Sequence, residues 1–130
     1  MEIHNLKFAK IGVVVSIIAN LVITALEFPP PIGFETRPQD NVSLAWLAYF
    51  FVILATQIAA ISLILKYPKT GAYLAMTAAI LNIFFVIADQ VHLLQPEAAT
   101  PLYSAIEGVG VIASLVIFYF AWEVRRLYSR

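Results

Sequence analysis

The fold is decided by the stretch Asn82-Ile-Phe-Phe-Val-Ile-Ala-Asp89-Gln-Val-His92, which places an amide, a carboxylate and an imidazole in a strongly apolar run. Asp89 lies seven residues after Asn82, and His92 lies three residues after Asp89. On an α-helix all three side chains therefore project from one face. Polar side chains in an apolar helix need polar partners, and this face is therefore expected to point into the protein. The stretch predicts a membrane-spanning helix with a polar inner face.

The composition of the whole chain indicates the same fold class. Of the 130 residues, 62% are hydrophobic and only 12% are charged, whereas soluble domains average about 25% charged residues. Four apolar runs are long enough to cross ~30 Å of hydrocarbon at ~1.5 Å per residue, and none shows the alternation of a barrel strand. The connections after the second and third runs are short, which favours antiparallel neighbours. The sequence predicts one all-α domain over residues 1–130, a transmembrane four-helix up-down bundle with helices at 8–28, 43–65, 72–94 and 102–122.

The basic residues indicate how this bundle is oriented. Seven of the eight Lys and Arg residues lie at the start of the first run, between the second and third, or after the fourth. Short segments rich in Lys and Arg stay on the cytoplasmic side of a membrane. Both termini are therefore expected in the cytoplasm, with the chain integral to a bacterial inner membrane.

Polar residues at the opposite ends of the runs form the candidate site. Glu27, Asp89 and Glu107 are expected at one level near the outer surface, where His92 is the only nearby side chain that could be cationic. A carboxylate in hydrocarbon costs several kcal/mol unless it is neutralised, so a proton or a bound cation is expected there. The side-chain amides of Asn20, Gln57 and Asn82 extend this group of polar residues toward the membrane midplane. The candidate ligand-binding residues are Asn20, Glu27, Gln57, Asn82, Asp89, His92 and Glu107.

Three interpretations of these residues stay open. They could form a structural network that holds the helices in register, a site for an amphipathic small molecule, lipid or quinone from the outer leaflet, or an ion site. Asp89-x-x-His92 resembles half of the Glu-x-x-His arrangement of di-iron bundles, but a second such motif is absent and no metal ligand is assigned. The chain has no cysteine, which excludes thiolate chemistry. No cofactor is assigned, and proton transfer through Glu107 and Asp89 is the one enzymatic alternative.

Small residues in the fourth apolar run indicate where another helix could pack. Gly110 and Ser114 have small-x-x-x-small spacing, which allows close approach of another helix in the same chain, in a second protomer or in a larger membrane complex. An accessory subunit of such a complex is the alternative to a ligand-binding protein. Membrane lipid is the expected surrounding, and no nucleic-acid partner is expected.

The chain resembles two groups of membrane proteins. Its length, its four helices, a longer first outer loop and the turn Lys66-Tyr-Pro-Lys-Thr-Gly-Ala72 resemble the DoxX-like small bacterial membrane proteins. Through Glu27, Asp89, His92 and Glu107 it is also similar to the acid-lined four-helix sterol-binding and sterol-isomerase proteins. The first resemblance implies a four-helix membrane fold, and the second implies a site that faces a lipid ring. Neither supplies an active site that transfers residue by residue.

Overall fold

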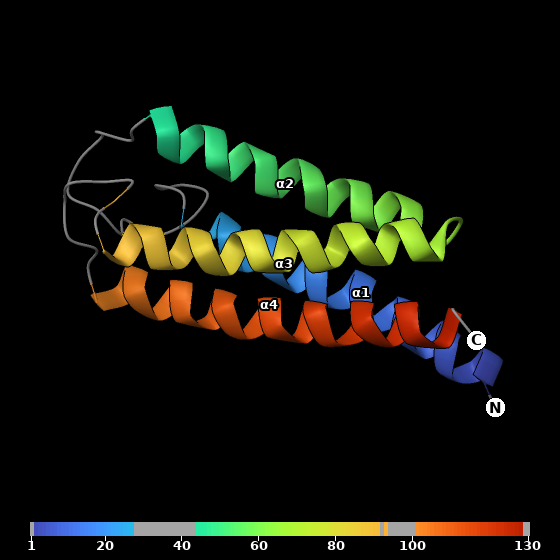
Figure 1. Cartoon of the computed structure of the whole chain (residues 1–130). Helices are drawn as coiled ribbons and strands as arrows, with labels where there is room; N and C mark the ends of the chain where they lie inside the picture. Colours follow the sequence, from blue (N-terminus) through green and yellow to red (C-terminus); the bar gives the residue numbers. More distant parts are fainter. Residues whose placement is uncertain (1, 28–43, 92, 94–100, 129–130) are drawn as a thin grey trace.

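A computed structural model describes residues 2–27, 44–91, 93 and 101–128 of the chain. These residues form four antiparallel α-helices and no strand, and both termini lie at the same end of the bundle (Figure 1). Each helix is long and apolar enough to cross a membrane. The predicted all-α four-helix bundle is therefore confirmed. The helices are α1 (Glu2–Ala25), α2 (Leu44–Ile64), α3 (Pro68–Gln90) and α4 (Pro101–Tyr128).

The helix boundaries differ from the predicted ones where polar residues flank the apolar runs. α4 continues to Tyr128, six residues beyond the predicted end, because a helix keeps its backbone groups hydrogen-bonded whether or not its side chains are apolar. Its 28 residues span ~42 Å, more than the ~30 Å hydrocarbon core. Its last turns can therefore reach the headgroup layer.

The bounds of α3 are shifted toward its N-terminus by four residues at each end. The helix begins at Pro68, a position that suits proline because the missing N–H would have no partner there. It ends at Gln90 rather than at residue 94. Asp89 consequently lies in the last turn of α3, closer to the end of the helix than the sequence predicted.

The helices do not all pack equally against their neighbours. α4 packs closely on α1 and on α3, and α3 packs closely on α2, whereas α1 and α2 make few contacts with each other. In Figure 1, α2 and α4 lie on opposite sides of α3, and α1 lies behind. The bundle is therefore least tightly closed along the α1–α2 seam.

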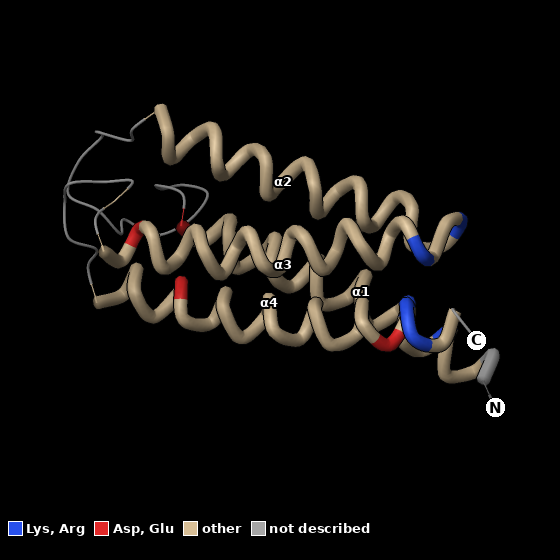
Figure 2. Tube along the Cα trace, in the orientation of Figure 1, with Lys and Arg blue, Asp and Glu red and all other residues tan. Residues whose placement is uncertain are grey.

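Charge divides the molecule into two ends. The described Lys and Arg residues gather where the termini lie, which we call the basic end, and Glu27, Asp89 and Glu107 lie toward the other, which we call the acidic end (Figure 2). Among the side chains that the structure describes, Glu123 is the one carboxylate outside this pattern, and it forms an ion pair with Arg126. The basic side chains of this end are Lys7, Lys10, Lys66, Lys69, Arg125 and Arg126.

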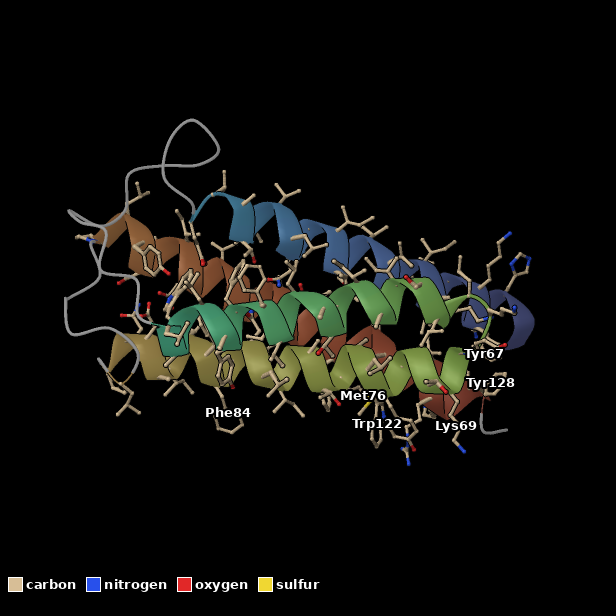
Figure 3. The ribbon with its side chains drawn as sticks, turned by 90° about the horizontal axis from the view of Figure 1, so that it is seen from above. Tyr67, Lys69, Met76, Phe84, Trp122 and Tyr128 are labelled. Carbon is tan, nitrogen blue, oxygen red and sulfur yellow. The ribbon has the colours of Figure 1, made fainter. Side chains whose placement is uncertain are left out.

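Two hydrophobic clusters occupy the two halves of the bundle. The cluster toward the basic end is rich in alanine and isoleucine, and it includes Ile17, Ala60 and Ala121. The cluster toward the acidic end is aromatic, and Trp46 and Phe50 stack within it with ring centroids 5.3 Å apart. Large apolar side chains such as Phe84 point away from the bundle (Figure 3). This outward apolar surface suits a lipid environment.

Candidate functional site

Most of the candidate side chains lie inside the bundle. Asn20, Gln57, Asp89 and Glu107 are each only 1% exposed, which is the inward orientation that the sequence predicts. Asn82 is half-buried. These residues come from all four helices, so the polar interior is assembled by the tertiary fold rather than by a single segment.

Two candidate residues lie at or beyond the helix ends. Glu27 follows α1, and its backbone N–H donates to the Thr24 carbonyl at 3.0 Å, so the carboxylate sits on a turn that continues the helix. His92 lies outside the described residues. The predicted contacts of His92 with Asp89 and Glu107 therefore remain predictions.

A chain of hydrogen bonds joins α3 to α4 at the polar level. The Asn82 amide donates from Nδ2 to Ser114 Oγ at 2.7 Å, and the Ser114 hydroxyl donates to the Gly110 carbonyl at 2.9 Å. A Cβ added to Gly110 would lie 3.8 Å from Asn20 Oδ1 and 3.9 Å from Asn82 Nδ2. The side-chain amides of Asn20 on α1 and Asn82 on α3 thus both lie close to this glycine. Gly110 and Ser114 are both buried, so here the small-x-x-x-small pair packs inside the chain.

A small cavity lies beside the Asn82 amide, between α1, α2 and α3. The hollow measures about 290 Å³ out to its open side, and about 20 Å³ of it admits a water-sized molecule, which is room for about one water. Half of its lining is polar and half is apolar. The polar residues are Thr24, Glu27, Gln57 and Asn82, and the apolar ones are Phe50, Ile53, Leu54 and Phe85.

Two buried amides near this cavity have unsatisfied atoms. In the part of the chain that the structure describes, Gln57 Nε2 and both side-chain polar atoms of Asn20 have no hydrogen-bond partner. A buried polar atom without a partner costs about 1–3 kcal/mol, and such atoms are normally satisfied by water or by a ligand. Rotation of the Gln57 amide exchanges its oxygen and nitrogen, so it can present either a donor or an acceptor to the cavity.

The chemistry that this lining offers is hydrogen bonding and charge. Thr24 donates its hydroxyl hydrogen to the Asn20 carbonyl at 2.8 Å, so only its oxygen lone pairs remain for the cavity. Glu27 contributes a carboxylate, and the side-chain amides of Gln57 and Asn82 contribute donors and acceptors. Within the described ranges no group of three or more His, Cys, Asp or Glu residues could hold a metal ion. The site is suited to a small polar group or a cation.

The cavity is not centred where the sequence predicts the centre of the site. Asp89 and Glu107 are buried but do not line it, because Asp89 stands seven residues beyond Asn82, about 10 Å farther along α3. Thr24 and the apolar lining residues were not among the candidates. Phe50, Ile53, Leu54 and Gln57 have i, i+3, i+4, i+7 spacing, which marks one helix face and could have identified them.

Comparison with known proteins adds no assignment to this geometry. The chain matches no protein-family model, no curated protein and no solved structure. The functional argument therefore depends on the residues and their arrangement.

Proposed function

We propose that this protein is an integral membrane protein of a bacterial inner membrane, with its basic end in the cytoplasm and its acidic end facing outward. The support is the gathering of the described Lys and Arg side chains at the end that holds both termini. Segments that carry such residues are retained on the cytoplasmic side. In this orientation the cavity opens within the outer half of the membrane.

We further propose that the cavity binds the polar group of an amphipathic small molecule from the outer leaflet. The observation that carries this proposal is the mixed lining of the cavity, which combines the amides of Gln57 and Asn82 with the rings of Phe50 and Phe85. Ligand sites typically combine an apolar wall with a few convergent polar groups. The unsatisfied Gln57 Nε2 would donate a hydrogen bond to a ligand hydroxyl or carbonyl oxygen.

The size of the cavity limits which part of the ligand is enclosed. About 20 Å³ admits a hydroxyl or a carbonyl group but no ring or chain. The apolar remainder would pass between α1 and α2, where the helices make few contacts, and would reach the lipid. A sterol, a quinone or a long-chain alcohol fits this description.

A second candidate is a monovalent cation, and the same cavity size favours it. A space for one water is also a space for one small ion. Thr24 and Glu27 offer oxygen atoms, and Gln57 and Asn82 can add carbonyl oxygens. Oxygen ligands are those that hard cations prefer.

Native mass spectrometry of the full chain, extracted in mild detergent, tests the first candidate. We expect the wild type to carry a small organic molecule and Gln57→Leu to lose it, because leucine removes both hydrogen-bonding atoms with little change in volume. Thr77→Val is the matched control, since Thr77 is exposed on α3 and bonds only the Tyr73 carbonyl at 2.8 Å. Equal retention by wild type and Gln57→Leu would contradict the proposal.

Thermal unfolding separates the cation from the amphipathic ligand. A ligand that binds only the folded state raises its melting temperature. A higher melting temperature in sodium chloride than in choline chloride, lost in Glu27→Gln, would select the cation. A second polypeptide in place of a small molecule or ion would instead support the accessory-subunit alternative.

A further inference from the structure

A second, larger hollow lies on the outside of the bundle, between α1 and α4. Its volume is about 460 Å³, and its floor includes small residues of both helices, Gly12 and Ala19 on α1 and Ala113 on α4. Phe8 and Phe120 meet at one end of it, edge to face, with centroids 6.0 Å apart. A Cβ at Gly12 would overlap the Phe120 ring, so glycine allows this ring to lie against the α1 backbone.

This hollow presents only apolar surface. Ser16 is the one polar residue in its lining, and its hydroxyl bonds the Gly12 carbonyl at 2.6 Å, which satisfies its donor within α1. Apolar surface of this kind binds hydrocarbon rather than water.

Another hollow, which includes polar residues, lies next to the first toward the basic end. This neighbouring space of about 270 Å³ shares Phe8 and Phe120 with the first, and it is also lined by Asn5, Glu123 and Arg126. Arg126 Nη2 and Glu123 Oε2 are 2.5 Å apart, and their side chains are 46% and 20% exposed. The two hollows follow one another along α1 and α4 and share the Phe8–Phe120 pair, and we call them together the α1–α4 groove, with an apolar part and a part that includes charged residues.

The length of the groove matches one leaflet of a bilayer. From Ala19 to Asn5, the outermost α1 residues of its lining, α1 advances by 14 residues, or ~21 Å at ~1.5 Å per residue. A bilayer with its headgroups is ~40–45 Å thick, so half of it is about the same length. The apolar part lies toward the middle of the helices, and the charged part lies toward the basic end.

We propose that the α1–α4 groove binds one phosphatidylethanolamine molecule of the leaflet at the basic end. One of its two acyl chains would lie in the apolar part, its phosphate against Arg126 and Asn5, and its ammonium against Glu123. A guanidinium has five N–H donors, so the bond to Glu123 leaves others for a phosphate. The second oxygen of the Glu123 carboxylate can accept from the ammonium.

Charge complementarity selects this lipid class over others. The groove presents one cation and one anion side by side, and phosphatidylethanolamine presents the opposite pair in the same molecule. Phosphatidylglycerol has no cation for Glu123. The quaternary ammonium of phosphatidylcholine has no N–H to donate.

Native mass spectrometry tests the proposal on the full chain, delipidated and then given equal amounts of phosphatidylethanolamine, phosphatidylglycerol and phosphatidylcholine. We expect phosphatidylethanolamine adducts to dominate in the wild type. Glu123→Gln should lower the preference over phosphatidylcholine by about tenfold, because the ammonium then donates to a neutral amide oxygen in place of a carboxylate. Arg126→Gln should weaken the binding of all three phosphates.

The matched control is Arg125→Gln, one residue away. The Arg125 guanidinium bonds the Tyr73 hydroxyl at 2.9 Å and lies 5.1 Å from the Trp122 ring, and it does not line the groove. This variant should keep the wild-type lipid preference. A bulky Ala113→Phe should reduce all lipid adducts while the monomer keeps its melting temperature in detergent, because it fills the apolar part.

Three results would overturn the proposal. They are equal adducts of the three lipids in the wild type, an Arg125→Gln effect as large as that of Arg126→Gln, and a dimer that excludes lipid and is lost in Ala113→Phe. The last result would identify a second copy of the chain as the occupant of the groove. Because the groove is separate from the Gln57 cavity, none of these outcomes depends on the proposed function.

Discussion

Among single residues, Asn82 connects several parts of the polar interior. It borders the cavity, donates to Ser114 Oγ at 2.7 Å and lies close to Gly110, so it links α3 both to α4 and to the candidate ligand site. Its role was predictable as an inward-facing amide. Its partner was not, because Ser114 could be read only as a small residue.

The Asn82–Ser114 bond should make a measurable but modest contribution to stability. We expect a double-mutant cycle of Asn82→Ala and Ser114→Ala to give a coupling energy near ~0.6 kcal/mol and no more than ~1.7 kcal/mol, the range of hydrogen bonds between membrane helices. Reversible unfolding in mixed detergent micelles measures it. Pairing Asn82→Ala with Thr77→Val, whose hydroxyl bonds only its own helix, should give no coupling. A similar coupling in both cycles would contradict the bond as the cause.

Among the elements, the hairpin of α2 and α3 depends on one close approach. A Cβ at Gly71 would lie 2.5 Å from the Cα and 2.6 Å from the backbone nitrogen of Ile64. The Gly71 N–H also donates to the Tyr67 carbonyl at 2.9 Å, which forms the first turn of α3. The two helices can therefore meet this closely only with glycine at position 71.

Gly71→Ala should destabilise the bundle, because backbone atoms rather than a flexible side chain must move. We expect a loss of about 1–3 kcal/mol, which is typical of overpacking. Gly108→Ala is the matched control, since a Cβ there meets nothing within 4 Å, and it should stabilise α4 by about 0.5–1 kcal/mol. Unfolding curves of both variants in the same detergent decide this. Equal shifts of the two curves would show that the Ile64 contact has no energetic role.

At the scale of the whole molecule, the charges define an axis. The described Lys and Arg residues and both termini share one end, and the three carboxylates of the candidate site lie toward the other (Figure 2). The chain has no cysteine, so single cysteines can report on each end without a background signal.

Cysteine labelling in intact cells should show the acidic end outside. Leu93, which is 78% exposed, lies at the acidic end, and Thr70 is exposed in the first turn of α3 at the basic end. We expect Leu93→Cys to react with a membrane-impermeant maleimide, and Thr70→Cys to react only after the cells are permeabilised. The reverse pattern would show that the basic end faces outward.

The sequence by itself determined the fold class, the number of helices and the inward orientation of the amides. Those properties depend on the length and composition of each segment, which are local. Apolar runs of about twenty residues must form helices in hydrocarbon, and isolated polar residues such as Asn20 must turn inward. Helix ends were less predictable, since α4 continues through Glu123 and Arg126 at no cost to its backbone hydrogen bonds.

Only the tertiary structure decided which polar residues meet. The neighbours and rotation of each helix follow from packing with the other three, and no single segment contains that information. This packing places Gln57 beside Thr24 and Glu27 around one cavity and leaves Asp89 and Glu107 outside its lining. It also buries Gly110 and Ser114 inside the chain. Gly12, in contrast, lines the α1–α4 groove on the outside of the bundle. The two outcomes differ because each face of a helix can pack against only one neighbour.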